Sequence, residues 1–292
     1  MKKMVYVLLV SIIISGCNFS KSVKKDLVSG LTSTGSGLTC EDVYLTVNNE
    51  RTSRNTFSYG DMIYLVFSDL KGFTTENGNV FPVMEIAVTD LTGDTALYAG
   101  DLYSEYTEGI KYSPLELTAD VTVATPIKSG GEYVLKVTIR DRKGSGSYNS
   151  KLRFTVEGNG NIKTEPFNVT YNEVYLYSQG NNKVINDGKI GFEDNVYIMA
   201  EGVNGFKVEN GKVFPGLGLK GTDSEGNVII DYPDLFTEYG NTGVDVSDFS
   251  ARVSANFKIT GNSFKNPLHC EMLLWDKKSD AKLKITTDLT LE

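Results

Sequence analysis

The chain has 292 residues, of which 40% are apolar and 23% are charged, and its formal net charge is −8 at pH 7. This length suits two domains of ordinary size, and the 16 tyrosines and 14 phenylalanines exclude the aromatic-poor composition of a disordered protein. The acidic balance argues against nucleic acid, or an anionic membrane surface, as the main partner.

The N-terminal stretch MKKMVYVLLVSIIISGC has a basic start, an apolar run over residues 4–14 and then small residues. This order predicts a secretory signal at residues 1–16 rather than a membrane-spanning helix. The sequence Ile-Ser-Gly-Cys at residues 14–17 resembles the lipobox of bacterial lipoproteins. The resemblance implies cleavage before Cys17 and lipidation of its thiol; an ordinary signal peptide that happens to be followed by a cysteine is the alternative.

The same resemblance implies a location in the bacterial cell envelope, with the membrane contacted through the lipid on Cys17. Asn18 is not the Asp that marks inner-membrane retention in enteric bacteria, so we expect the outer membrane or the cell surface rather than the inner membrane. Residues 17–39 are rich in Ser, Thr, Gly and Lys, a composition that predicts a flexible, lipidated tether.

Two other cysteines, Cys40 and Cys270, could pair in an oxidising envelope. They lie at opposite ends of the folded region, and Cys270 aligns with Leu135 of an internal repeat. We therefore expect Cys270 to be a small buried hydrophobe rather than half of a disulfide.

An internal repeat governs the rest of the chain. The string GFTTENGNVFP starts at Gly72 and GFKVENGKVFP starts at Gly205, and residues 70–106 match the chain 133 positions later at 15 of 37 positions. A period this long indicates duplicated domains rather than a solenoid. The predicted domains are repeat 1 at residues 40–157, a linker at 158–170 that is rich in Gly and Asn, and repeat 2 at 171–292.

Within each repeat the apolar residues recur with a period of two, which predicts β-strands. The Asn-Gly pairs at 77–78 and 210–211 lie between apolar runs and predict hairpin turns. We expect Phe81 and Phe214, which follow these turns, to be available for the core, and the next residue of each repeat, a proline, to stand near the start of a strand.

The stretch GEYVLKVTIRDRKG, followed by KLRFTV, resembles the last two strands of Ig-like bacterial domains. The resulting prediction is an all-β chain with two tandem, mutually homologous Ig-like β-sandwich domains. The second repeat departs from this pattern because Tyr133 aligns with Leu268, which cannot make a tyrosine-corner hydrogen bond.

Catalytic motifs are scarce. The chain has one histidine, His269, which we interpret as structural, and it has no nucleophile elbow, no zinc-protease motif and no phosphate loop. We therefore expect that the protein is not an enzyme. Hydrolysis of a polysaccharide by two carboxylates needs no histidine and stays as an alternative.

Acidic residues recur in both repeats, and several fall at predicted strand ends. The pairs are Asp61 with Asp194, Asp90 with Asp223, Asp101 with Asp234, Glu105 with Glu238, and Asp141 with Asp276. Oxygen ligands from loops can hold Ca²⁺, so these residues are calcium candidates, and no other cofactor is expected. The competing interpretation is that they are inherited turn residues that bond to their own backbone.

In the repeated segment Asp-Leu-(Tyr/Phe)-x-Glu-Tyr, we favour packing of the Leu and the aromatic residue on the core, with the acids in water. Trp275, the only tryptophan, should share an outward face with His269, Glu271 and Leu273. An outward Trp could bind a sugar ring, although burial between the two repeats is the favoured interpretation.

These features together predict a non-catalytic cell-envelope lipoprotein. Its tandem Ig-like domains would act as a binding or scaffold module for a protein or glycan partner, not for nucleic acid. A fimbria-like assembly subunit, a calcium-dependent binding module and a polysaccharide-acting enzyme are the alternatives.

Overall fold

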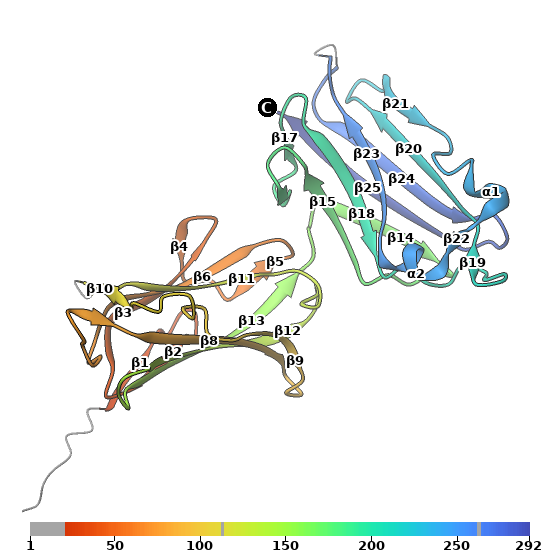
Figure 1. Ribbon diagram of the computed structural model, residues 1–292. Helices are drawn as coiled ribbons and strands as arrows, with labels where there is room; N and C mark the ends of the chain where they lie inside the picture. The colour runs from red at the N-terminus through yellow and green to blue at the C-terminus, as the bar shows by residue number, and fades with distance from the viewer. Residues whose placement is uncertain (1–20, 112–113, 262–263) are drawn as a thin grey trace, which may run out of the picture.

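The computed structural model describes residues 21–111, 114–261 and 264–292, and nearly all its regular structure is β-strand (Figure 1). Within this part of the chain, strands up to Glu157 pair only with one another, and so do strands from Ile162 onward. We call residues 21–157 the N-terminal half and residues 162–292 the C-terminal half. The all-β sandwich prediction is confirmed, because each half has two sheets that enclose a shared hydrophobic core.

The N-terminal half contains a seven-stranded sheet, a four-stranded sheet and a two-stranded ribbon. The larger sheet runs, in spatial order, β1 (Lys21–Lys25), β2 (Thr32–Ser36), β13 (Ser147–Glu157), β12 (Glu132–Asp141), β8 (Pro82–Asp90) and β9 (Thr95–Ala99), with β5 (Thr56–Ser58) parallel to β13. The smaller sheet is β11 (Leu117–Thr122), β6 (Met62–Lys71), β3 (Thr39–Val47) and β4 (Glu50–Thr52), and the ribbon pairs β7 (Asn79–Val80) with β10 (Ile110–Lys111).

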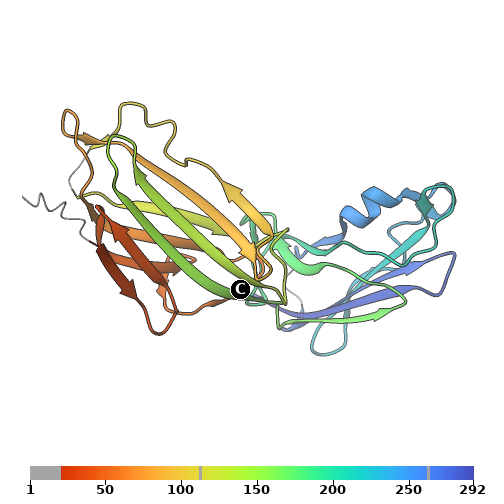
Figure 2. The ribbon, with the colours of Figure 1, turned by 90° about the horizontal axis from the view of Figure 1, so that it is seen from below.

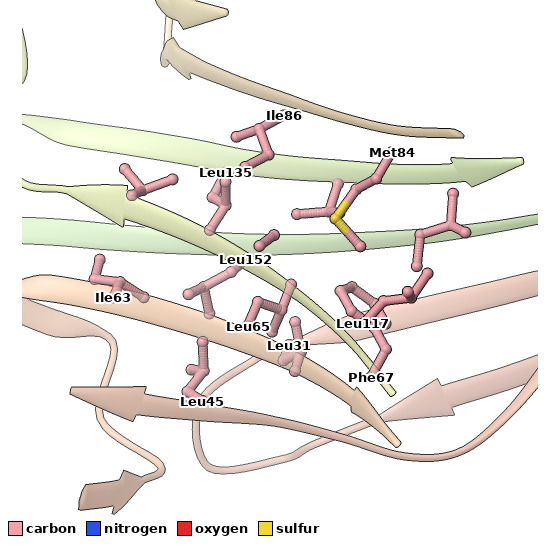
Figure 3. Packing of buried hydrophobic residues seen from close by; sticks show 14 of the residues in the cluster. Leu31, Leu45, Ile63, Leu65, Phe67, Met84, Ile86, Leu117, Leu135 and Leu152 are labelled. Carbon is pink, nitrogen blue, oxygen red and sulfur yellow. The ribbon is translucent and has the colours of Figure 1, made fainter. Parts of the chain in front are cut away.

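The core of the N-terminal half forms because one side chain in two faces the opposite sheet. Leu45 and Leu65 come from the four-stranded sheet, and Ile86 and Leu135 come from the seven-stranded sheet (Figure 3). All four are at most 2% exposed. The period of two read from the sequence therefore corresponds to the inner faces of a sandwich.

The C-terminal half contains a six-stranded sheet, a four-stranded sheet, a ribbon and two short helices. The larger sheet runs β14 (Ile162–Phe167), β25 (Lys282–Leu291), β24 (Leu268–Asp276), β20 (Pro215–Thr222) and β21 (Val228–Tyr232), with β17 (Lys189–Ile190) parallel to β25. The smaller sheet is β16 (Lys183–Val184), β15 (Glu173–Ser178), β18 (Asn195–Glu201) and β23 (Val253–Lys258). The ribbon pairs β19 (Lys212–Val213) with β22 (Val244–Asp245), and the helices are α1 (Tyr239–Thr242) and α2 (Val246–Ala251).

The strand orders of the two halves correspond. The smaller sheets read β11-β6-β3-β4 and β23-β18-β15-β16, and each larger sheet has a short strand lying parallel to its last long strand. Each half also has a two-stranded ribbon that starts just after its Asn-Gly pair. Descent of the halves from one duplicated domain stays a prediction.

The repeated Asn-Gly pairs form tight turns, as expected. Asn77 and Gly78 both have positive φ, at 55° and 79°, and Asn210 and Gly211 repeat this at 52° and 77°. Backbone hydrogen bonds close both turns between the residues that flank each pair. These dihedral angles match a type I′ turn, which explains why Asn-Gly is used twice.

The packing around these turns differs from the expectation in one respect. Val80 and Val213 enter the cores, whereas Phe81 and Phe214 are only half-buried on the outer side. A lysine lies over each ring, with 4.7 Å from the Lys143 ammonium to the Phe81 centroid. The expected core role of the phenylalanines is wrong because alternation along the strand gives the inward position to the preceding valine. The following prolines begin β8 and β20, as predicted.

Two predicted boundaries are also wrong. The expected tether at residues 17–39 contains β1 and β2, and the expected linker at 158–170 contains β14. Strands β2 and β14 each pair antiparallel with the last long strand of their half. Strand β2 was not recognised because its composition is rich in Ser, which usually indicates an exposed segment. Ser33 is nevertheless buried, and its hydroxyl is hydrogen-bonded to that of Ser150, with 2.7 Å between the two oxygens. The predicted signal at residues 1–16 and the predicted lipidation site Cys17 lie outside the described residues.

The two halves lie end to end (Figure 2), and turns at one end of the N-terminal half touch the outer face of the smaller sheet of the C-terminal half. The rings of Tyr59 and Tyr175 lie with their centroids 5.0 Å apart and pack with Met199. Strand β15 is consequently buried on both faces over most of its length, unlike β12, which alternates. Gly60, at φ 91°, lets Val184 approach so closely that a Cβ atom there would lie 2.2 Å from the Val184 Cβ.

Hydrogen bonds fix the same contact. The Thr125 hydroxyl donates to the Glu201 carboxylate (2.9 Å), whose other oxygen accepts from the Tyr175 hydroxyl (2.8 Å). The backbone N–H of Ser129 donates to Glu173, which is buried (2.9 Å). Burial and the neighbouring Glu201 raise the pKa of Tyr175, so this phenol stays a donor. The halves therefore meet in one specific geometry.

We expect Gly60→Ala to disrupt this contact, because the added Cβ overlaps a branched side chain that cannot move away. Small-angle X-ray scattering should show a changed maximum dimension, and limited proteolysis should cut faster near residues 158–161. Gly93→Ala is the matched control, since Gly93 has φ 99° and open space around its Cβ position. It carries the same backbone strain, so equal effects of the two substitutions would contradict the close approach.

Candidate functional site

The repeated acids do not gather into a metal site. Among residues 21–111, 114–261 and 264–292, no group of three or more His, Cys, Asp or Glu side chains is placed to hold a metal ion. The candidates instead bind nearby backbone N–H groups and cations one by one. The geometry favours the turn interpretation over the calcium interpretation.

Asp141 and Asp276 fasten the repeated Gly-Phe loop to the sheet. The Asp141 carboxylate accepts from the N–H of Thr74 (2.7 Å) and of Lys143 (3.0 Å). Asp276 accepts in the same way from the N–H of Lys207 (2.8 Å) and of its own turn. Both carboxylates are buried, so each satisfies backbone donors that would otherwise be left unpaired.

Asp90 and Asp223 shape the hairpins that follow β8 and β20. Asp90 accepts from three backbone N–H groups of its own turn, and Asp223 from those of Glu225 and Asn227. The hydrogen bond from the Thr92 hydroxyl lowers the pKa of Asp90, and that from the Asn227 amide lowers the pKa of Asp223, with backbone donors adding to both. Both carboxylates are thus held in their charged form by the turn.

Asp101 and Asp234 begin the repeated acidic segment, and each pairs with a cation, Arg142 and Lys277 respectively. Burial alone would raise the pKa of Asp234, but the Lys277 ammonium and the N–H groups of Leu217 and Phe236 outweigh it and lower the pKa.

In the rest of that segment the aromatic side chains Tyr103 and Phe236 pack on the two cores. Leu102 and Leu235 are exposed, against expectation, because the turn directs them outward. Glu105 and Glu238 are exposed and make no side-chain hydrogen bond among the described residues. The expected packing role is correct for the aromatic residues alone.

Asp61 and Asp194 are the least alike of the pairs. Asp61 is buried, accepts from the N–H of Ser58 (3.0 Å) and pairs with the Arg54 guanidinium (2.9 Å). Asp194 accepts from the Ser178 hydroxyl and from the N–H of Gly180. Both organise local turns.

The single histidine and the two described cysteines have structural surroundings. His269 is exposed and its Nδ1 lies 2.7 Å from Asp288, its cross-strand neighbour. Cys40 and Cys270 are buried free thiols. Burial raises the pKa of Cys40 to about 11 and that of Cys270 to about 12, so both thiols stay protonated and unreactive. The predicted role of Cys270 as a buried hydrophobe is confirmed.

Trp275 lies where its strand period places it, on the outer face of the six-stranded sheet. Its indole covers Gly216 and lines a shallow hollow of about 260 Å³ together with Tyr232 and Glu271. Every residue that lines this hollow belongs to the C-terminal half. The favoured expectation of burial between the repeats is therefore wrong, because the halves meet through the opposite, smaller sheet.

A groove that sequence reasoning missed lies between the halves. It has a volume of about 360 Å³ and is lined by both of them, including four tyrosines, Tyr59, Tyr64, Tyr175 and Tyr177. Three asparagines, Asn48, Asn49 and Asn182, stand on hairpin turns at its edge. The available signal was the strand Val-Tyr-Leu-Tyr at 174–177, which carries aromatic residues at positions that should face water.

Comparison with known proteins adds little. No family model matches the chain, and no curated protein matches it. Among solved structures, pT26-6p is similar over 93% of this chain, with a TM-score of 0.24 and 8% identity, and this chain spans 65% of its length. A structure of the three FKBP domains of wheat FKBP73 is similar over 78% of this chain and 95% of its own, with a TM-score of 0.15 and 9% identity.

We expect Asp276→Ala to destabilise the C-terminal half by about 1–3 kcal/mol, because it leaves buried N–H donors without an acceptor. Urea denaturation measures this change. Glu238→Ala is the control and should lie within about 0.5 kcal/mol of the native protein, because its side chain is exposed. A Ca²⁺-dependent shift of the unfolding midpoint that Asp276→Ala abolishes would instead favour the metal interpretation.

The lowered pKa of Asp223 predicts that the folded protein loses stability in acid. Its pKa in the folded chain lies below the unfolded value, so its contribution is complete above the unfolded pKa and is lost as pH falls through the folded pKa. The urea midpoints of the native protein and Asp223→Asn should differ by a constant amount at neutral pH and converge from about pH 5 downward. The neighbouring Glu225→Gln should follow the native curve, and parallel curves for Asp223→Asn down to low pH would contradict the assignment.

Proposed function

We propose that the chain is a non-catalytic, lipid-anchored protein of the bacterial cell envelope whose two tandem Ig-like domains bind or scaffold a protein or glycan partner. The observation that carries the binding role is the fixed contact between the halves, with side chains of both lining one groove. A groove at a domain boundary is a common place for a ligand. Such a site exists only while the two sandwiches keep their relative positions.

Duplication of one domain fits the same proposal. The matching strand orders, the two Asn-Gly turns and the paired aspartates support descent of both halves from one sandwich. Most repeated acids are used to hold loops, which leaves few of them for chemistry. The scaffold is thus the duplicated part, and the surface between the copies is the part that could take on a role of its own.

Anchoring rests on the lipobox resemblance at residues 14–17. Among the described residues, no helix is long and apolar enough to cross a membrane. A lipid on Cys17 would supply the membrane attachment.

The anchor is tested by Cys17→Ser in the producing bacterium. We expect the native protein to enter the detergent phase on Triton X-114 partitioning and to take up labelled fatty acid, and the variant to do neither. Cys40→Ser is the control and should behave as the native protein, because Cys40 is buried within the first half. Detergent partitioning and labelling that survive Cys17→Ser would contradict the proposal. Separately, protease treatment of intact cells reports whether the anchored protein faces outward.

A further inference from the structure

We propose that the groove between the halves binds an uncharged sugar unit, such as one hexose residue of a glycan. This inference rests on the proposed binding function and names its ligand class and its site. The groove has three properties that suit a sugar: exposed aromatic faces, amide groups on a well-defined backbone, and a lining without carboxylates.

The aromatic faces come from the outer sides of the two smaller sheets. Tyr177 and Tyr64 are half-buried at the groove, and Tyr59 and Tyr175, whose rings are in contact, also line it. Tyr197 packs edge-on against Tyr177, with ring centroids 6.4 Å apart, and holds it in place. The C–H face of a pyranose ring is apolar and packs on such a ring, while its hydroxyls stay at the edge.

The amides come from two hairpin turns that overhang the groove. Asn48 and Asn49 form the turn between β3 and β4, and Asn182 ends the turn between β15 and β16, all three with positive φ. The Tyr177 hydroxyl donates to the Asn182 side-chain oxygen, which orients that amide. A side-chain amide both donates and accepts, as sugar hydroxyls do, so these groups can satisfy a vicinal diol.

Charge and size restrict the ligand. The chain carries a net charge of −8, yet the residues lining the groove include no Asp or Glu, and Lys183 is the one charged residue among them. Lys183 makes no ion pair among the described residues and can donate to a hydroxyl. A volume of about 360 Å³ accommodates one or two sugar rings rather than a folded protein surface.

The hollow at Trp275 is the competing sugar site. It is smaller, at about 260 Å³, and Asp231 and Glu271 contribute charge to its lining. Its indole is covered on one side by the glycine strand β20. Two aromatic side chains, Trp275 and Tyr232, line the hollow, whereas four tyrosines line the groove, and the lining of the hollow has no asparagine amide.

The test is saturation-transfer NMR on the purified mature chain, in a detergent without a sugar headgroup. The probes are the methyl glycosides of glucose, galactose, mannose and N-acetylglucosamine, and the disaccharides maltose, cellobiose and lactose. We expect at least one probe to bind, and Tyr177→Ala to weaken it about tenfold or more. Asn49→Gly and Asn182→Gly should each weaken it about two- to tenfold, because glycine keeps the positive φ and removes only the amide.

Two controls distinguish a loss of binding at the groove from a general effect of the substitutions on the fold. Asn77→Gly and Asn210→Gly make the same exchange at positive φ in turns outside the groove, and should leave affinity unchanged. Trp275→Ala should also leave it unchanged. Loss of binding in Trp275→Ala, with full binding in the groove variants, would overturn the assignment of the sugar site to the groove and leave the proposed binding function in place. Absence of binding for every probe would overturn the sugar inference. If a protein partner then binds the native chain but not Tyr177→Ala, the groove is a peptide-binding site instead.

Discussion

The interaction on which both halves depend is the hydrogen bond from a loop N–H to a buried aspartate at the end of a central strand. Asp141 and Asp276 accept from Thr74 and Lys207, the residues directly after the Gly-Phe pair of each repeat. A buried N–H without an acceptor is costly, so each loop can run across the end of its sandwich only while its carboxylate is present. This requirement explains why the Gly-Phe string and a distant aspartate recur together, without any ligand at the acid.

The sequence allowed good prediction of features that are determined locally. Both Asn-Gly turns and the inward period of β24 depend on neighbouring residues, and the structure has them as expected. Strands β2 and β14 were missed because each is held in its sheet by pairing with a strand over a hundred residues away rather than by apolar alternation of its own.

The candidate site shows the same division between local and distant causes. The role of the aspartates as turn residues was open in the sequence, since both alternatives needed only an acid near a strand end. The groove itself could not be predicted, because Tyr64 and Tyr177 line the same groove only through the packing of the two halves. A strand with apolar residues on its inner face and tyrosines on its outer face indicates that something covers the outer side, but it does not say what.

The early start of the first sheet limits the distance that the proposed lipid anchor would allow between the first sandwich and a membrane. Strand β1 begins at Lys21, four positions after the cysteine proposed to carry lipid, and four residues reach at most about 14 Å even when fully extended. That distance is comparable to the thickness of a headgroup layer, so the first sandwich would stand directly on the bilayer instead of drifting above it. If Cys17 carries the proposed lipid, the groove would be separated from the lipid by one domain and would be reached only by molecules within that height.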